Sequence, residues 1–182
     1  MDQKTDAEIV TRVLKGDVQA YALLIEAYKA PVFNLAFRMT GRHDDAEDLT
    51  QEIFIRAYQK LHTFNQGKKY FTWLYTLSIN LIRNYLKKKA RDMTPELVGS
   101  HLSGQQPQGH EGREGDLLNE DSMRRLEEGM QKLPVDLREA IILKYHQDMT
   151  FEEVAAITGD SLSAVKMRVY RGLETLEKIM KD

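Results

Sequence analysis

Apolar residues recur along the chain with the period of an α-helix, and the alternation typical of a strand is almost absent. The first periodic run opens with Thr5 and Glu8, which have the spacing of a capping box. Gly16 follows the run, where a glycine can close a helix in the left-handed conformation. These signals predict a first helix bounded by Thr5 and Gly16.

Three more helical runs follow before the pattern changes. Residues 18–41 form one run that ends at Gly41, and Pro31 inside it is expected to kink or interrupt the helix. Residues 44–61 form the next, with acidic residues in the first turn, where the helix dipole favours them. A polar loop separates this run from residues 70–91, which we also expect to be helical.

The helical period disappears between Asp92 and Asn119 and then resumes. This segment is rich in Gly, Gln, Ser and Pro and is acidic on balance, so it cannot bury enough apolar surface to offset its ordering entropy. We interpret residues 92–119 as a flexible linker. Beyond it, the periodic positions predict four further helices up to the C-terminus. The sequence therefore predicts an all-α fold with two small helical domains, residues 1–91 and 120–182, joined by the linker.

Composition narrows the class of protein. The 182 residues are 42% hydrophobic and 30% charged, so the chain can bury a core and stay in solution. The absence of cysteine excludes disulfides and thiolate metal sites and suits a reducing cytoplasm. The acidic N-terminus lacks the apolar stretch of a signal peptide, and no apolar run approaches a membrane span. We expect a cytoplasmic protein without membrane insertion.

The net charge of −2 gives no reason to expect nucleic acid, but residues 70–91 concentrate aromatic and basic side chains. On a helical wheel one face is apolar, and the opposite strip carries Trp73, Thr76, Asn80, Asn84, Lys87 and Arg91. Rings stack on unpaired bases, amides bond base edges, and cations hold phosphates. Lys88 extends the basic end, and the neighbouring loop adds Gly67 and Lys68 as the wall of a base pocket. The strip suits partly melted DNA, whereas the alternative is a solvated, charged helix end.

A second nucleic-acid signal lies near the C-terminus. Thr150 and Glu153 have capping-box spacing, and Gly159 stands at the turn of a helix-turn-helix pattern. In the second helix one stripe is apolar: Leu162, Val165, Val169, Leu173 and Leu176. The opposite face, which a recognition helix would present to the major groove, carries Ser163, Ala164, Lys166, Met167, Arg168 and Arg171. A purely structural helical hairpin matches the same pattern.

Four segments, in this order and spacing, resemble a bacterial extracytoplasmic-function sigma factor: DAEDLTQEIFIRAYQKL, TWLYTLSINLIRNYLKKK, LPVDLREAIILKYHQDMTFEEVAAITG and AVKMRVYRGLETL. The resemblance implies a protein that is not an enzyme, needs no cofactor, and directs core RNA polymerase to promoter DNA. The first domain would melt and read the −10 element, and the second would read the −35 element. Relatives are commonly held inactive by anti-sigma partners, so an anti-sigma factor is expected as well.

The resemblance also assigns a role to the third helical run, residues 44–61. One polar side of this run carries Asp45, Asp48, Gln51, Glu52 and Arg56. In the family this neighbourhood docks on a coiled coil of the polymerase's large subunit, and acidic and amide groups facing basic helices provide steering and register. An ordinary solvated helix face is the alternative. A metal site made of His43, Asp44, Asp45 and Asp48 is disfavoured, because adjacent acids at a helix start point in different directions.

This sequence departs from the family at a few positions of the two DNA-reading surfaces. Asn84 stands where many relatives carry Asp, and Met167 stands where a small or polar residue is more usual. Asp160 occupies a turn position that is commonly apolar, and Ser161 replaces a frequent proline. These departures bear on the promoter sequence that is read, not on the class of protein.

Two competing hypotheses come from other classes. A two-domain repressor or activator that never meets polymerase would bind duplex DNA tightly and specifically by itself. A protein-interaction module would use the aromatic and basic strip to bind another helical protein. An enzyme has little support, because the sequence offers no Gly-rich phosphate loop, no clustered histidines and no nucleophile–base spacing.

Overall fold

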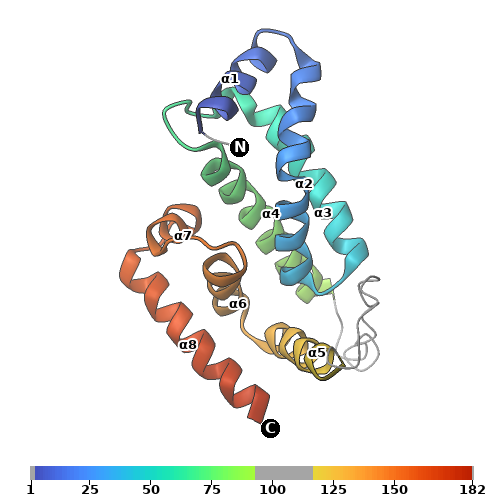
Figure 1. Cartoon of the computed structure of the whole chain (residues 1–182), viewed down its shortest axis with the longest axis vertical. Helices are drawn as coiled ribbons and strands as arrows, with labels where there is room; N and C mark the ends of the chain where they lie inside the picture. The colour runs from blue at the N-terminus through green and yellow to red at the C-terminus, as the bar shows by residue number, and fades with distance from the viewer. Residues whose placement is uncertain (1–2, 93–116, 182) are drawn as a thin grey trace.

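The computed structural model describes residues 3–92 and 117–181, and every regular element within those two ranges is a helix. The first region runs from blue to green in Figure 1. Its elements are α1 (Gln3–Leu14), η1 (Val18–Ala20), α2 (Tyr21–Thr40), α3 (His43–Lys60), η2 (Leu61–Thr63) and α4 (Tyr70–Asp92). The all-helical prediction is confirmed for the described residues.

The second region runs from yellow to red in Figure 1. Its elements are α5 (Leu117–Lys132), α6 (Val135–Ile141), the π-helical turn η4 (Ile142–His146), α7 (Phe151–Thr158) and α8 (Leu162–Lys181). Most of the predicted linker lies outside the described residues. Its last residues, from Leu117, belong to α5, so the helix begins earlier than the sequence pattern indicates.

Several helix ends follow the local signals. Gly16, Gly41 and Gly159 all have positive φ, and Gly41 and Gly159 cap α2 and α7 in the left-handed conformation. Thr150 and Glu153 form both halves of a capping box at the start of α7. The capping box expected at Thr5 is wrong, because α1 already begins at Gln3 and Thr5 lies inside it.

Pro31 does not interrupt α2, which is one helix from Tyr21 to Thr40. Proline removes one backbone donor, which weakens the helix locally. Tyr28, Val32 and Leu35 flank Pro31 and are buried against the rest of the core. Burial of large apolar side chains contributes roughly 1.5–3 kcal/mol each, which outweighs one missing hydrogen bond.

The core of the first region lies between α2, α3 and α4. Tyr70 and Tyr75 at the start of α4 are among its largest fully buried side chains. The Tyr28 hydroxyl donates to Asp6 over 2.6 Å, and the Tyr21 hydroxyl donates to the Phe54 carbonyl oxygen over 2.8 Å. These bonds satisfy buried hydroxyls and fix the helices around the apolar centre.

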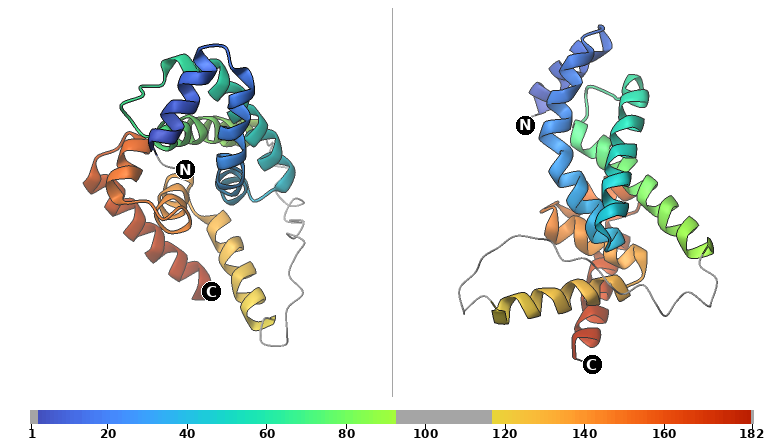
Figure 2. Two further views of the ribbon diagram at one scale, coloured as in Figure 1. Left: turned by 45° about the horizontal axis from the view of Figure 1, so that its top comes forward. Right: turned by 90° about the vertical axis from the view of Figure 1, so that its right-hand side faces the viewer.

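The two regions pack against each other. In Figures 1 and 2, α7 lies beside the upper half of α4, and α5 crosses below the first region. Buried apolar side chains from both regions form one continuous cluster. This packing leaves one long side of α4 facing α3 and turns another side towards α6 and α7.

Candidate nucleic-acid and polymerase interfaces

A hollow of about 330 Å³ lies between α3 and α4. Trp73, Thr76, Asn80 and Asn84 line it from α4, in the order in which the sequence places them on one strip. Opposite them lie Arg56 and Lys60 of α3, with Thr63 of η2. The hollow therefore brings together an aromatic ring, amides and two cations, and the cations come from a helix that sequence reasoning did not assign to DNA.

The aromatic end of the hollow is packed against the core. The Trp73 ring packs on Phe64 and on Tyr70, with ring centroids 5.6 Å and 5.5 Å apart. Tyr70 is fully buried, and Trp73 is half-buried. The indole is thus anchored by the core on one side and lines the hollow with the other, which gives a fixed surface on which a base can stack.

Amides and cations follow Trp73 along α4. Asn80 and Asn84 are exposed, and neither makes a side-chain hydrogen bond within the described part of the chain. Lys87, Lys88 and Arg91 are exposed beyond them. The amides are therefore available to base edges, and the cations are available to phosphates.

The loop before α4 carries Gly67 and Lys68, both exposed. Gly67 does not adopt a left-handed conformation, so no sharp turn depends on it. The turn is instead held by Asn65, whose side-chain oxygen accepts from the Gly67 N–H over 2.9 Å. A Cβ at position 67 would lie 3.2 Å from that oxygen, so a larger residue would require the exposed Asn65 side chain to shift slightly.

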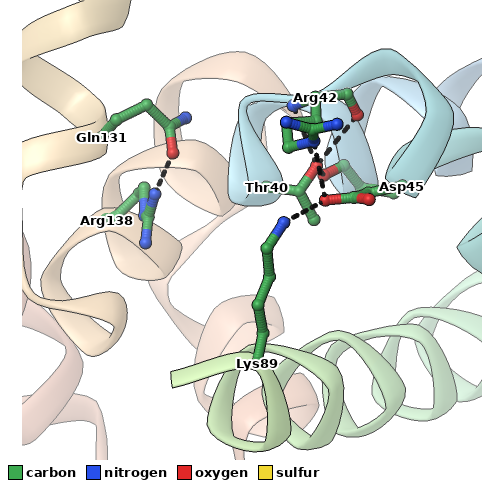
Figure 3. A network of polar contacts seen from close by, with 7 residues as sticks. Thr40, Arg42, Asp45, Lys89, Gln131 and Arg138 are labelled. Atoms are coloured by element: carbon green, nitrogen blue, oxygen red, sulfur yellow. Dashed lines mark hydrogen bonds and ion pairs between the residues drawn. The ribbon is translucent and has the colours of Figure 1, made fainter. Parts of the chain in front are cut away.

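One cation of the basic run is withdrawn from the surface. Lys89 Nζ lies 2.6 Å from Asp45 Oδ2 of α3, and Arg42 adds a second contact at 3.5 Å (Figure 3). Only 17% of the Asp45 side chain is exposed. The sequence places Asp45 among the polymerase-facing residues, but the structure turns it towards α4, where it links two helices.

The rest of that polar side of α3 is open. Asp48 and Gln51 are exposed, and Glu52 pairs with Arg56 one turn further along the helix. Sequence reasoning missed Ile55 and Tyr58, which are 53% and 41% exposed beside them. Their spacing from Gln51, four and seven residues, is the signal that places them on the same face.

On α8, most of the predicted reading face is accessible. Ser163, Lys166, Met167 and Arg171 are exposed, and Ala164 is half-buried. The Lys166 ammonium also lies 5.7 Å from the centre of the Phe151 ring. These side chains share one side of the helix, as a major-groove reader requires.

Arg168 behaves differently from its neighbours. Its guanidinium pairs with Asp160 in the turn and lies 3.7 Å from Asp136 of α6. The hydrogen bond to Asp160 raises the pKa of Arg168. At Asp160, desolvation by burial raises the pKa of the carboxyl. The hydrogen bond and the charge of Arg168 act in the opposite direction, and the pKa of Asp160 is lowered. Asp160 thus holds Arg168 against its own region.

Leu162 was expected in the buried stripe of α8 but is 37% exposed. It is the first residue of the helix, so no preceding helical turn covers it. Val165, Val169 and Leu176 are buried and Leu173 is partly buried, which confirms the rest of the stripe.

The structure gives no support to a metal site. His43 faces Glu47 at 3.8 Å and packs edge-on against Phe33. Across residues 3–92 and 117–181, no three potential ligands gather closely enough to hold an ion. Within the same ranges, no helix combines the length and apolar character that a membrane span requires.

Comparison with known proteins gives consistent matches over both regions. The family model of Sigma-70 region 2 matches residues 24–92, and that of Sigma-70, region 4 matches residues 123–176. The chain is 33% identical over 179 residues to the ECF RNA polymerase sigma factor SigW of Bacillus subtilis, covering 95% of each chain. It is 32% identical over 181 residues to the ECF RNA polymerase sigma-E factor of Escherichia coli K12, covering 97% of this chain and 94% of the relative.

A solved structure is similar over both regions as well. The sigma factor RpoE of Bartonella quintana, in complex with the anti-sigma factor NepR, superposes with a TM-score of 0.71. The two chains are 25% identical, and the match covers 88% of this chain and 96% of that one.

Proposed function

This chain belongs to the extracytoplasmic-function sigma factors of the sigma-70 family, and we propose that its two helical regions divide promoter recognition between them. As an alternative sigma factor it directs transcription by RNA polymerase. In the proposed division, residues 1–91 bind core polymerase and open the −10 element, and residues 120–182 read the −35 element. The hollow between α3 and α4 is the observation that carries this proposal.

The contents of the hollow suit a strand that has left the duplex. Unstacking a base costs a few kcal/mol, so the protein must supply replacement contacts. Trp73 offers a stacking surface, and Asn80 and Asn84 offer donors and acceptors for base edges. Arg56 and Lys60 on the opposite wall, with Lys87, Lys88 and Arg91 beyond the amides, can follow the phosphates.

The exposed side of α8 supports duplex reading. Ser163, Lys166, Met167 and Arg171 are the side chains that can reach base edges or phosphates, with Ala164 allowing close approach. Arg168 contributes indirectly, because its pair with Asp160 orients the start of α8. Asp160 and Arg168 thereby act together as a support for the reading face.

Polymerase docking is assigned to the open side of α3. Asp48, Gln51 and Glu52 provide polar register, and the exposed Ile55 adds an apolar anchor of the kind that strengthens interfaces. Asp45 does not belong to this open surface, but its ion pair with Lys89 holds α3 against α4.

An anti-sigma factor is the proposed regulatory partner. The similar solved chain is a sigma factor held by an anti-sigma factor, and its match extends over both helical regions. We propose that a partner of this type engages both regions of the present chain while they are packed together.

The decisive experiment is a pull-down with core polymerase followed by run-off transcription. Replacing Gln51 and Glu52 together by Ala should change the free energy of unfolding by under about 0.5 kcal/mol, because both are at the surface. Binding to core polymerase should fall clearly. The matched control replaces Glu174 and Glu177 of α8, which are exposed, and should leave binding unchanged.

The competing hypothesis makes the opposite prediction. A regulator that acts without polymerase would bind duplex DNA tightly on its own and would be indifferent to the Gln51 and Glu52 substitutions. Failure of the folded wild-type chain to bind core polymerase would remove the docking surface from the proposal.

A further inference from the structure

Two large apolar side chains are exposed on the proposed reading side of α8. Met167 is 50% exposed and Tyr170 is 63% exposed, although sequence reasoning did not place Tyr170 on this side. Residues three positions apart are neighbours on a helix surface, so the two side chains form one patch. A scattered apolar side chain is ordinary at a protein surface, whereas a patch on a binding surface indicates a contact.

Met167 lies on the side of α8 that faces away from the core of its region. At about 100° per residue it is about 180° from Leu176 and about 160° from Val165, which are both buried. Tyr170 lies about 60° to one side of Met167, and Arg171 lies about 40° to the other. The apolar patch is therefore central on the side that a duplex would meet.

Charged residues on the same side of α8 show which part of the helix suits DNA. Lys166 precedes Met167 and Arg171 follows it by one turn, and both cations are exposed. Further along, Glu174 lies about 20° from Met167 around the helix. Its carboxylate pairs with Lys178 over 2.8 Å and would repel a phosphate. The part of α8 that suits a polyanion therefore ends before Glu174, and the patch lies within that part, between its two cations.

The chemistry of the major groove limits what this patch can contact. Base edges in that groove carry hydrogen-bond donors and acceptors and one apolar group, the methyl of thymine. The thioether of Met167 is no donor and only a weak acceptor. A polar base edge beneath it would lose its hydrogen bonds to water without replacement, which is unfavourable. The thymine methyl is therefore the group in the groove that this side chain matches.

The spacing of Met167 and Tyr170 suits neighbouring base pairs. Three residues rise about 4.5 Å along a helix, and successive bases of one strand are about 3.4 Å apart. A recognition helix in the groove can thus place the two side chains on consecutive base pairs. The Tyr170 hydroxyl keeps a donor and an acceptor for a polar edge, so Met167 is the more selective of the two for a methyl.

We propose that Met167 is a specificity-determining residue that reads a thymine methyl in the −35 element, with Tyr170 covering the adjacent base pair. The proposal rests on the duplex reading proposed above and adds the chemical group that α8 selects. Its consequence is a preference of this chain for thymine at one base pair of the element. A small polar side chain at position 167 would not produce that preference.

The test first identifies a bound duplex and then removes single methyl groups from it. The full-length chain, alone and with core polymerase, selects duplexes from a pool with randomised positions. In the selected duplex each thymine in turn is replaced by deoxyuridine, which lacks only the methyl. At one position the wild type should lose about fourfold in affinity, the contribution of one buried methyl. Met167→Ala should bind the thymine duplex several-fold more weakly and should no longer distinguish thymine from deoxyuridine there.

Controls separate the methyl contact from general effects on binding or folding. Met123→Ala changes the same residue type on α5 at a similar exposure, 44%, and should keep the wild-type preference for thymine. Lys166→Ala should weaken binding to both duplexes by the same factor, because their phosphates are identical. Circular dichroism checks that each variant keeps its helices. If Met167→Ala loses them, Met167→Gln, which has a similar length and a polar end, decides and should also lose the preference.

The outcomes distinguish this inference from the proposed function. If no sequence is enriched, α8 does not read a duplex, and both proposals fail. If a sequence is enriched but every deoxyuridine duplex binds as tightly as the original, the methyl contact alone fails. A folded Met167 variant with the wild-type preference for thymine also overturns it. If Met167→Ala lowers affinity for core polymerase and not for DNA, the patch is a protein contact, and the methyl contact is overturned.

Discussion

The two proposed DNA surfaces of this protein are built in different ways. The first is a hollow with walls from α3 and α4 and an aromatic end anchored in the core. The second is the outer side of a single helix, α8, without an opposing wall. A hollow can enclose a base that has been unstacked, whereas a convex helix suits the major groove of an intact duplex.

At each surface one basic residue is exposed, and another nearby in the same helix is held in an ion pair. In α4, Lys88 is exposed while the adjacent Lys89 pairs with Asp45. In α8, Arg171 is exposed while Arg168 pairs with Asp160. Basic residues close together in one helix therefore differ in their surroundings. The position of an acidic partner decides which cation is held in an ion pair and which faces solvent.

The largest effect is expected from removing one amide of the hollow, Asn80, together with Lys88 beyond it. Asn80→Ala with Lys88→Ala removes one base-edge contact and one phosphate contact, which should cost about 2–3 kcal/mol in opening of the −10 region. Binding to polymerase and to −35 duplex should be spared. Opening is measured by permanganate reactivity on a normal promoter and on one already mismatched at −10.

Comparing the two promoters shows which step of promoter opening the double variant impairs. Equal defects on both indicate that the strip captures the separated strand, and a defect on the normal duplex alone indicates melting. The matched control, Lys29→Ala with Asn34→Ala, changes the same residue types on the exposed side of α2. A double variant that opens both promoters normally reduces the basic cluster of α4 to a charged helix end.

Next in size is the effect of Arg168 on stability. Arg168→Ala should lower the free energy of unfolding by about 1–2 kcal/mol, because it leaves the largely covered Asp160 without its partner. Arg171→Ala should change it by under about 0.5 kcal/mol. Thermal unfolding of the two variants gives the comparison, and equal melting temperatures would contradict the division of roles.

A comparable effect is expected on duplex binding by α8. Lys166→Ala and Arg171→Ala should each reduce the salt dependence of −35 binding by about one unit, since each phosphate contact contributes roughly that much. If either residue reads a base, discrimination at one base pair should relax by about 1–3 kcal/mol. Lys178→Ala, on the same helix but paired with Glu174, is the control. Normal transcription after alanine replacement of Ser163, Lys166, Met167 and Arg171 would exclude α8 as the reader.

The smallest expected effect is a difference in stability between variants of the neighbouring residues Lys88 and Lys89 of α4. Lys89→Ala should lower the free energy of unfolding by about 0.5–1 kcal/mol, because Asp45 is mostly covered and loses its closest cation. Lys88→Ala should leave stability within about 0.5 kcal/mol but weaken binding to single-stranded −10 DNA. Urea midpoints and oligonucleotide titrations of both variants test this, and a reversal of the two patterns would refute it.

Much of the secondary structure and of the candidate surfaces could be predicted from the sequence, because the signals are local. Gly41, Gly159 and the Thr150 capping box act within a few residues of the helix ends that they determine. Likewise, helical spacing alone places Trp73, Asn80 and Asn84 on one strip and Ser163, Met167 and Arg171 on another. The resemblance to the family rests on similarly short segments, and the match over most of the chain confirms it.

The tertiary structure decided which of these side chains face outward and what they meet. Three ion pairs join residues that are far apart in the sequence, so no local pattern links the partners. They are Lys89 with Asp45, Arg168 with Asp136, and Arg83 with Glu139. Helical periodicity gives the direction of a side chain around its own helix, but the partner depends on how helices pack. The hollow that joins Arg56 to Asn84, and the closure of one region on the other, exist only because α3, α4 and α6 come together in three dimensions.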